Sequence, residues 1–358
     1  MKLLVISPYF YPKIGGLENY AWNISKGLSE KYGWDIVVVT SNHIEKKYKT
    51  EIIEGIKIYR LPRLIKISNT PINPFWLFQL KKIIRIEKPD MINAHTPVPF
   101  MSDIAGLVSG KIPLYLTYHA GSLVKGNKIL DVPLTMYEKF FLPNLLRKSK
   151  KIICVSSFIS ENLLKKFKHK CEIISPGVDT GLFKPGTRTT KKNTILFIGN
   201  QKGMYKLKGL YTLISAIKHI PDAKLRIIGE QDYSKDKQIE YIGYKRGIDL
   251  VKEIQNSNIV VLPSAYDESF GMAIIEAMAC KKPVIGSNAG GIPNVISDGK
   301  DGLIVPSNDI LSLVKALRYL LKNSDIAEDM GDKGYLKIKK LYLWSIKINE
   351  TYKILKKS

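Results

Sequence analysis

The chain has 358 residues, a hydrophobic content of 45% and a formal net charge of +24. This length exceeds one ordinary domain and fits two domains of roughly 150–200 residues each. No uninterrupted apolar run approaches the ~20 residues that span a membrane. The apolar start, residues 1–7, is too short for a signal peptide and lacks a small-residue cleavage site. Composition therefore argues against a membrane-spanning chain, and we expect a globular protein whose first strand is Lys2–Ser7.

The charge excess comes from 56 Lys and Arg residues against 32 Asp and Glu residues. Nucleic acid, an anionic membrane and an anionic substrate would each explain it, and lysine- and isoleucine-rich genome composition would explain part of it without any function. The three cysteines, Cys154, Cys171 and Cys280, are odd in number and lack the spacing of a zinc site. We expect buried thiols in a reducing compartment. This predicts a cytoplasmic protein, with peripheral attachment to the cytoplasmic membrane face as an option.

Apolar, β-branched runs alternate with helical patterns along the whole chain, which predicts an α/β protein with parallel sheets covered by helices on both faces. In the first half the expected strands are Lys2–Ser7, Ile36–Thr40, Ile56–Leu61, Met91–Ala94, Leu114–Tyr118, Ile152–Val155 and Glu172–Ile174. The polar stretch Thr187–Asn193 is typical of a linker. The pattern then restarts with Ile195–Gly199, Leu225–Gly229, Ile239–Ile242, Ile259–Leu262, Val284–Gly286 and Leu303–Val305.

This pattern predicts two Rossmann-like, doubly wound domains, residues 1–186 and 187–340, followed by a segment 341–358 that is helical from about Trp344 to Lys356. Ligands of such sheets bind beyond the carboxyl ends of the strands. We therefore expect the two domains to face each other across a central cleft that holds the ligand.

The most informative segment contains Glu268 and Glu276. The apolar run Ile259–Leu262 predicts a buried strand, residues 263–268 the loop after it, and residues 271–279 a helix. Glu268 would then lie above the sheet edge and Glu276 about a turn and a half into the helix. The free backbone N–H groups of Ser269, Phe270, Gly271 and Met272 can hold an anion. Two carboxylates and an anion nest suit a ligand with hydroxyls and phosphates, which describes a nucleotide sugar.

Glu268, seven residues and Glu276, with Ser-Phe-Gly after the first Glu, resemble the donor-site motif of retaining glycosyltransferases of family 4, which have the GT-B fold. Further motifs of that family occur in order and at its usual spacing. They are Gly286-Ser287-Asn288-Ala289-Gly290-Gly291-Ile292-Pro293, Asp298-Gly299-Lys300-Asp301-Gly302-Leu303-Ile304-Val305, and upstream Pro8, Gly15-Gly16-Leu17-Glu18, Thr117-Tyr118-His119 and Ser175-Pro176-Gly177-Val178-Asp179. The resemblance covers nearly the whole chain. It also implies that the last helix crosses back to the first domain.

The resemblance implies roles for both glutamates. Glu276 would accept hydrogen bonds from the ribose hydroxyls of the donor, and Glu268 would contact hydroxyls of the transferred sugar. The alternative for Glu276 is a solvated helix face, but Ala273, Ala277 and Ala279 make this helix small and apolar, where an unpaired carboxylate is out of place.

Lys208-Gly209 is expected to begin a helix directly after the strand 195–199 and its loop. Lys208 resembles the family's diphosphate-binding lysine, whose charge would stabilise the leaving nucleoside diphosphate. The family usually has an arginine just after the strand's glycine, and here that position is Asn200. Lys202 or Lys206 would supply the missing charge, or the loop closes differently. The alternative for Lys208 and Lys202 is a surface lysine.

Gly15-Gly16 lies between the first strand and a helix, where adjacent glycines let a ligand approach the backbone. The resemblance places this loop beside the donor diphosphate and the reacting sugar; the alternative is a plain strand-to-helix turn. His119 and His95 end two neighbouring strands. That position favours a sugar- or phosphate-contacting role for His119, whereas His95 could equally be an inert loop histidine.

A basic and aromatic segment of the first half could face a membrane and fetch a lipid-linked acceptor. It contains Arg60, Arg63, Lys66, Phe75, Trp76, Leu77, Phe78, Lys81, Lys82, Arg85 and Lys88. The alternative is an amphipathic helix that packs on the sheet and exposes a solvated basic face. Residues 137–151 leave the same choice open.

The resemblance implies a hexosyltransferase-type enzyme that moves a sugar from a nucleoside-diphosphate donor to an acceptor hydroxyl with retention, for polysaccharide, glycolipid or lipid-linked oligosaccharide synthesis. The leaving phosphate would help deprotonate the acceptor, so no general base is needed. We expect no cofactor and no essential metal, since no metal-ligand cluster is evident. Alternatives are a GT-B epimerase or phosphorylase, a basic protein that binds membranes or polyanions without catalysis, and an inactive scaffold. No specific nucleic-acid motif is present.

Overall fold

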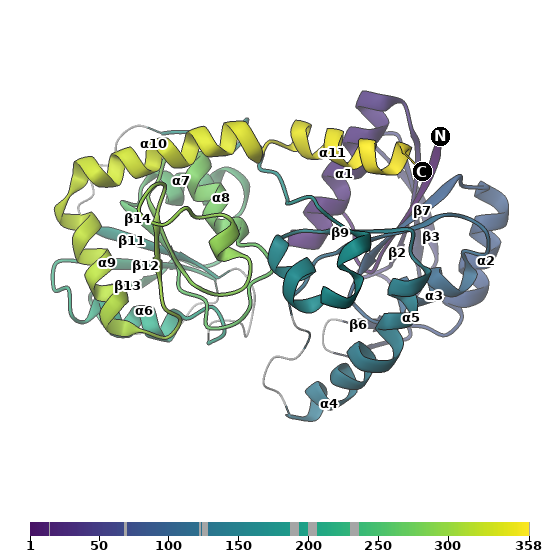
Figure 1. The fold of residues 1–358 in the computed structure, drawn as a ribbon, viewed down its shortest axis with the longest axis horizontal. Helices are drawn as coiled ribbons and strands as arrows, with labels where there is room; N and C mark the ends of the chain where they lie inside the picture. Colours follow the sequence, from purple (N-terminus) through teal and green to yellow (C-terminus); the bar gives the residue numbers. More distant parts are fainter. Residues whose placement is uncertain are drawn as a thin grey trace. The chain divides into compact units, whose positions relative to one another are not determined.

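A computed structural model describes residues 1–13, 15–67, 70–121, 123, 128–186, 193–199, 206–229 and 236–357. The chain divides into two compact units (Figure 1). Unit 1 comprises Met1–Pro176 together with Trp344–Ser358, and unit 2 comprises Gly177–Leu343. Each unit contains a largely parallel β-sheet covered by helices, as the alternation of strand and helix patterns predicts.

Unit 1 is built on an eight-stranded sheet in the order β10-β9-β8-β7-β1-β2-β4-β3. Its strands are β1 (Lys2–Ser7), β2 (Asp35–Ser41), β3 (Lys49–Ile53), β4 (Ile56–Leu61), β7 (Met91–Thr96), β8 (Leu114–Tyr118), β9 (Lys151–Cys154) and β10 (Cys171–Ile173). Strand order reverses at β1, which pairs in parallel with β2 on one side and with β7 on the other. This is the switch point at which doubly wound sheets hold their ligands.

The helices of unit 1 follow the strands in sequence. They are α1 (Gly16–Tyr32), α2 (Trp76–Glu87), α3 (Met101–Val108), α4 (Lys128–Met136), α5 (Leu142–Lys148) and α11 (Trp344–Lys356), with the shorter turns Tyr137–Phe141, Ile159–Leu163 and Lys165–Lys170. Strands β1, β2, β7 and β8 are almost fully buried, because helices cover both faces of the sheet.

Helix α11 belongs to unit 1 because it packs along α1 (Figure 1). A Cβ atom on Gly27 would lie 2.1 Å from Ile348 Cδ1, so only glycine lets the two helices approach this closely. The rings of Tyr32 and Tyr352 stack with their centroids 3.7 Å apart. The Tyr32 hydroxyl also bonds Asn349 Oδ1 at 2.8 Å.

The first sheet is parallel, as expected, except at one edge. Strand β3 pairs antiparallel with β4 through a hairpin whose turn residues, Glu54 and Gly55, have φ angles of 47° and 79°. Positive φ at both positions gives the twist that joins two hairpin strands. Strands β5 (Ile65–Ile67) and β6 (Thr70–Ile72), which form a small antiparallel pair, were not predicted either. All three missed strands are short, and two of them are largely exposed, so they lack the buried apolar run used to find the others.

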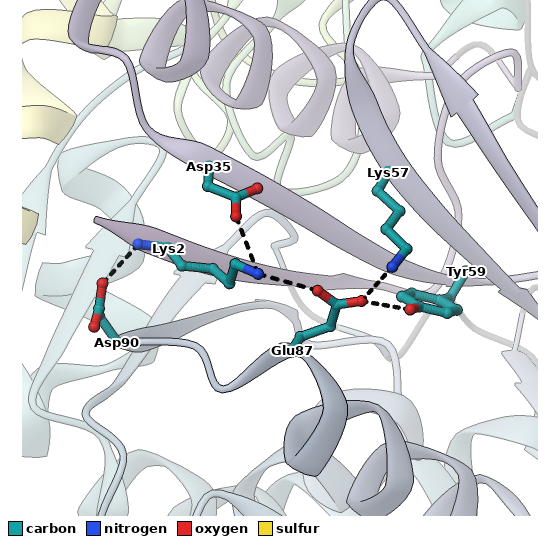
Figure 2. A network of polar contacts seen from close by, with 6 residues as sticks. All are labelled: Lys2, Asp35, Lys57, Tyr59, Glu87 and Asp90. Atoms are coloured by element: carbon teal, nitrogen blue, oxygen red, sulfur yellow. Dashed lines mark hydrogen bonds and ion pairs between the residues drawn. The ribbon is translucent and has the colours of Figure 1, made fainter.

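A polar network closes the amino ends of β1, β2 and β4 against the end of α2 (Figure 2). Glu87 is buried and receives hydrogen bonds from Lys57, Tyr59 and Lys2. Burial by itself would raise the pKa of Glu87, but these three donors outweigh it and lower the pKa to about 2. Lys2 Nζ also bonds Asp35 at 3.0 Å. Because every carboxylate here is paired, the network ties sheet and helix together.

Unit 2 contains a six-stranded parallel sheet in the order β13-β12-β11-β14-β15-β16. Its strands are β11 (Thr194–Ile198), β12 (Lys224–Ile228), β13 (Ile239–Tyr241), β14 (Ile259–Leu262), β15 (Val284–Ser287) and β16 (Leu303–Val305). Its helices are α6 (Leu210–Ile217), α7 (Gly247–Gln255), α8 (Met272–Ala279), α9 (Ile310–Lys322) and α10 (Ser324–Leu341), with a short turn at Ile292–Asn294. Strand order reverses between β11 and β14, so the loops after these strands lie at the switch point of unit 2.

The units divide at Pro176/Gly177 and Leu343/Trp344, whereas the boundaries expected from the sequence fall after residues 186 and 340. Contacts of residues 177–186 explain the difference. The N–H group of Val178 donates to the Tyr342 carbonyl at 2.7 Å. Gln255 Nε2 donates to the Lys184 carbonyl at 2.7 Å. This segment therefore packs on unit 2, although its sequence continues the first half of the chain.

Candidate functional site

The loop between β14 and α8 is fixed by two glycines from another part of unit 2. The N–H group of Gly291 donates to the Glu268 carbonyl at 2.6 Å. A Cβ atom on Gly290 would lie 2.1 Å from that same carbonyl oxygen, and one on Gly291 would lie 2.4 Å from the Ser269 carbonyl oxygen. Gly290 also has a φ of +55°. These glycines allow the backbone contact that sets the position of Glu268.

A third glycine brings Lys208 to this loop. Gly209 has a φ of +75°, and a Cβ atom there would lie 1.8 Å from the Pro263 carbonyl oxygen. The N–H group of Ala265 donates to the Leu207 carbonyl at 2.7 Å. Lys208 Nζ consequently lies 3.8 Å from Glu268 Oε1, and the two side chains are 16% and 13% exposed. At these exposures water screens the pair only in part.

The Glu268 carboxylate is held by several groups. Ser264 Oγ donates to Glu268 Oε2 at 3.3 Å. The Tyr266 hydroxyl is also hydrogen-bonded to Glu268; burial and this carboxylate raise the pKa of Tyr266. Ser264 is itself fully buried, and its carbonyl accepts bonds from the hydroxyls of Ser287 and Ser307. Glu268 is thus an oriented, paired carboxylate.

Glu276 is in a different state. It lies in the second turn of α8 and is half-buried, and no described residue donates a hydrogen bond to it. Burial raises the pKa of Glu276 to about 7, although the positive charge of Lys208 acts in the opposite direction. Lys208 therefore lies within electrostatic range of both carboxylates. Near neutral pH the Glu276 carboxyl is poised between its two protonation states.

Helix α8 begins at Met272, one residue later than expected from the sequence. Gly271 is its N-cap, with a φ of +100°. Phe270 is buried and contacts the ring of Tyr342, which anchors the chain just before the helix. The backbone N–H groups of Ser269, Phe270, Gly271 and Met272 bond no acceptor among the described residues. These four amides are free to bind a ligand.

Unit 1 brings His95 and His119 together at the carboxyl ends of β7 and β8. His95 Nδ1 and His119 Nε2 lie 2.7 Å apart. The rings are nearly parallel, at 13°, with centroids 4.9 Å apart, which together with the short N···N distance describes an in-plane hydrogen bond. Burial lowers the pKa of His95 to about 3. Burial and the neighbouring His95 lower the pKa of His119 as well. Both rings are neutral at physiological pH.

Tyr20 of α1 closes this histidine pair from one side. Its ring packs edge-on against His119 and His95, with centroids 5.1 and 6.3 Å away. Its hydroxyl donates to the Ile174 carbonyl at 3.3 Å. Tyr20 was not among the residues predicted from the sequence. Tyr20 lies one helical turn after Gly16, on the buried face of α1, and this spacing could have identified it.

Gly15 and Gly16 lie at the start of α1, as expected from the sequence. A Cβ atom on Gly15 would lie 2.3 Å from Glu18 Oε2, whereas one on Gly16 would meet no described atom within 4 Å. Glu18 is buried and pairs with Lys13 Nζ at 3.2 Å. A side chain at Gly15 would displace the Glu18 carboxylate, whereas the backbone at Gly16 is open.

Other residues singled out from the sequence have different outcomes. Lys202 and Asn200 lie outside the described residues, and Lys206 is exposed. Arg60 and Trp76 are buried, so they cannot belong to a membrane-facing surface. Phe75 and Phe78 are 60% and 66% exposed and remain available. Cys171 is half-buried, unlike the two buried cysteines.

A cavity of about 320 Å³ in unit 2 lies away from the predicted site. It is lined by residues at the amino ends of the strands, among them Asn193, Asn258 and Pro283, and by none of the predicted site residues. Across the described part of the chain, no helix is both long and apolar enough to cross a bilayer. The same residues contain no cluster of three or more His, Cys, Asp or Glu side chains arranged to hold a metal ion.

Comparison with known proteins gives consistent results along the whole chain. Two family models match in succession, Glycosyltransferase Family 4 over residues 14–182 and Glycosyl transferases group 1 over residues 180–337. An uncharacterized glycosyltransferase of Methanocaldococcus jannaschii is 30% identical over 352 residues, covering 93% of this chain and 92% of that protein. The D-rhamnosyltransferase WbpZ of Pseudomonas aeruginosa is 23% identical over 356 residues, covering 93% of this chain and 90% of that protein.

Solved structures show the same architecture. Sucrose-phosphate synthase from Thermosynechococcus elongatus has a TM-score of 0.82 at 20% identity, covering 99% of this chain and 98% of its own. Anabaena HepE in complex with UDP-glucose has a TM-score of 0.78 at 15% identity, covering 100% of both chains. The family and fold that the sequence motifs predicted are confirmed. The chain belongs to the group 1 glycosyltransferases of family 4 type and has the GT-B fold.

Proposed function

We propose that this chain transfers a sugar, of hexosyl type, from a nucleoside-diphosphate sugar to an acceptor hydroxyl with retention of the anomeric configuration. One observation carries the proposal: Lys208 lies 3.8 Å from Glu268 and acts electrostatically on Glu276, and the loop that follows Glu268 has four free backbone amides. A ligand that offers hydroxyls to the carboxylates and a diphosphate to the lysine and amides would satisfy all of these groups. Anabaena HepE, solved in complex with UDP and with UDP-glucose, supports such a donor.

In this proposal each residue has a defined contact. Glu276 accepts hydrogen bonds from the ribose hydroxyls, and Glu268, held by Ser264 and Tyr266, binds hydroxyls of the transferred sugar. Lys208 and the 269–272 amides stabilise the negative charge that develops on the leaving diphosphate. His119 and the Gly15-Gly16 backbone contact the reacting sugar. The neutral state of the histidine pair suits hydrogen bonding to uncharged hydroxyls.

The reaction needs no dedicated base in this proposal. The bond between the anomeric carbon and the diphosphate oxygen breaks, and the acceptor oxygen forms a bond to the same face of that carbon. The acceptor proton passes to the departing phosphate oxygen. Charge stabilisation comes from Lys208 and the amides, so we propose that neither a metal nor a cofactor is required.

The acceptor would be a glycan or a lipid-linked molecule, in polysaccharide, glycolipid or lipid-linked oligosaccharide synthesis. We place the enzyme in the cytoplasm, with peripheral membrane contact through α2. Phe75, the N-cap of this helix, and Phe78 are exposed, and Lys81 and Lys82 of the helix are exposed as well. Apolar side chains flanked by cations are typical of interfacial helices.

Calorimetric titration of a panel of nucleoside diphosphates and their sugars, in chelator, tests the donor site. We expect one sugar nucleotide to bind saturably to the wild type and to lose at least tenfold in affinity with Glu276→Ala. Asp222→Ala, which removes an exposed carboxylate at the opposite edge of the sheet, is the matched control and should bind as the wild type does.

Absence of binding by every member of the panel to the folded protein would overturn the proposal. Steeply salt-dependent binding of any polyanion, unchanged by Glu276→Ala, would instead favour the non-catalytic basic protein. A nucleotide sugar converted or cleaved without any acceptor would favour an epimerase or a phosphorylase.

A further inference from the structure

A second group of polar side chains gathers in unit 1, at the edge formed by the carboxyl ends of β1, β2 and β4. Tyr9, His43 and Arg63 each lie two residues beyond the end of one of these strands. The three strands are parallel neighbours, so their carboxyl ends meet. Arg60 lies near the end of β4, Lys13 in the loop after β1, and Lys66 on β5. We call these six residues the basic cluster.

Three polar atoms of the basic cluster are buried without a hydrogen-bond partner among the described residues. They are the Tyr9 hydroxyl, His43 Nδ1 and Arg60 Nη1. Tyr9 and Arg60 are only 5% and 3% exposed. A buried polar atom without a hydrogen-bond partner is energetically unfavourable, and native proteins contain few of them. Three such atoms around one sheet edge indicate a missing partner.

In Arg60, one nitrogen of the guanidinium lacks a hydrogen-bond partner among the residues that the structure describes, while the other two are bonded. Its Nε bonds Glu51, and its Nη2 donates to the Tyr11 carbonyl at 2.6 Å. The guanidinium is therefore held rigidly from one side while Nη1 keeps its donors free. A fixed guanidinium with one open edge is suited to an oxyanion.

The basic cluster also carries more positive than negative charge. Of its four cations, Lys13 pairs with Glu18 and Arg60 pairs with Glu51, which Lys49 also contacts. Within the described part of the chain, Arg63 and Lys66 form no ion pair. Burial, with added repulsion from Lys66 and Arg63, lowers the pKa of Lys13 despite its pairing with Glu18. An anion would relieve this repulsion.

We infer that the basic cluster is a binding site for a phosphate group. A phosphate monoester presents several acceptor oxygens and up to two negative charges, which match donors that come from several strands and the unbalanced charge. A carboxylate offers one charge and one plane. On the proposed function, on which this assignment rests, the phosphate belongs to the acceptor, because unit 2 supplies its own lysine and amides to the donor. The enzyme would then glycosylate a phosphate-bearing acceptor.

The test uses the full-length protein and inorganic phosphate as the probe, with UDP, GDP and ADP present to fill the donor site. We expect saturable phosphate binding by calorimetry. Arg63→Gln combined with Lys66→Gln should weaken it at least tenfold. Lys81→Gln combined with Lys82→Gln removes the same charge from the exposed face of α2 and should leave it unchanged. Tyr9→Phe, which loses only an unpaired hydroxyl, should also weaken phosphate binding several-fold without loss of stability.

Equal phosphate affinity in the cluster and α2 variants, or no saturable binding with the donor site filled, would overturn the assignment. Nucleoside-diphosphate binding is measured on the same variants. If it fails in every protein while phosphate still binds, the proposed function fails and the phosphate site stands. Two further measurements identify the source of the phosphate. Sedimentation with phosphatidylcholine vesicles that depends on added phosphatidylinositol points to a lipid. Saturable titration with a soluble sugar phosphate points to a soluble acceptor.

Discussion

Two carboxylates, one in each unit, are shifted in opposite directions by their surroundings. Glu87 at the end of α2 receives three hydrogen bonds, and its pKa falls to about 2 (Figure 2). Glu276 in α8 receives none from the described residues, and its pKa rises to about 7. Burial acts on both in the same sense, so the donors decide the outcome. The fold satisfies the Glu87 carboxylate, which is consistent with a structural role, and leaves the Glu276 carboxylate without a donor among the described residues, which is consistent with the ligand role proposed for it.

The largest effect is expected at Lys208, which acts on the carboxylate that the described part of the fold leaves without a hydrogen-bond donor. Lys208→Ala removes the positive charge that acts on both Glu268 and Glu276, and we expect kcat/KM to fall by about 10²–10³-fold, the loss typical for a group that stabilises developing negative charge. Lys206→Ala removes an exposed lysine two residues away and should have an effect of less than about threefold. Steady-state kinetics with the donor identified by calorimetry decide the matter. Equal losses in both variants would show that Lys208 acts only through net charge.

The next effect concerns the position of that lysine. Gly209→Ala forces a Cβ atom onto the Pro263 carbonyl at a φ of +75° and should destabilise the protein by about 3 kcal/mol. Gly299→Ala meets no atom within 4 Å at a similar φ of +71° and should cost only about 1 kcal/mol of backbone strain. Urea unfolding of both variants isolates the close contact. Similar losses would mean that the loop shifts freely and that Lys208 is not held in place.

The satisfied carboxylate should stabilise the fold above its unfolded-state pKa. Glu87 titrates near 4.5 when unfolded and near 2 when folded, so its contribution is present above about pH 4.5 and lost as the pH falls toward 2. Glu87→Gln should therefore lower the free energy of unfolding by about 2 kcal/mol at pH 7, and less in acid. Unfolding curves across this pH range provide the measurement. A pH-independent difference would contradict the shift.

The unsatisfied carboxylate should act with the opposite sign and a smaller size, because Glu276 is half-exposed. Its folded pKa lies above its unfolded pKa, so its contribution is fully present below about pH 4.5 and lost as the pH rises through about 7. Glu276→Gln should make the free protein more stable by about 1 kcal/mol at pH 8, yet weaken nucleotide binding. Thermal unfolding with and without the nucleotide shows both. A variant less stable than wild type at pH 8 would place Glu276 with Glu87 as a structural residue.

Buried strands were predictable from the sequence because they are short apolar runs between turn residues. Strands β1, β4, β8, β14 and β16 begin and end at the expected residues. Strand β3 was missed because only one face is covered, although Glu54-Gly55 between two β-branched runs is a hairpin signal. Its antiparallel direction follows from that turn.

The candidate site was predicted at the level of segments. The motif around Glu268 and Glu276 placed both carboxylates on the right elements, but the pairing of His95 with His119 and the network around Glu87 join residues far apart in sequence. The His95–His119 contact could have been anticipated, since both end neighbouring parallel strands. The pKa of Glu276 is raised because the described residues that bury it donate no hydrogen bond to it, and the local sequence does not show which residues those are.

The docking of α11 on α1 has a consequence for biosynthesis. Ribosomes synthesise a chain from its amino end, and domains generally fold as their sequence emerges from the ribosome. Here the partner of the Gly27 face, α11, is translated only after all of unit 2. The Gly27 face of α1 therefore stays without its partner helix until unit 2 has been synthesised. A truncated or stalled chain would therefore present a completed second unit beside an unfinished first one, a form that quality-control proteases can recognise.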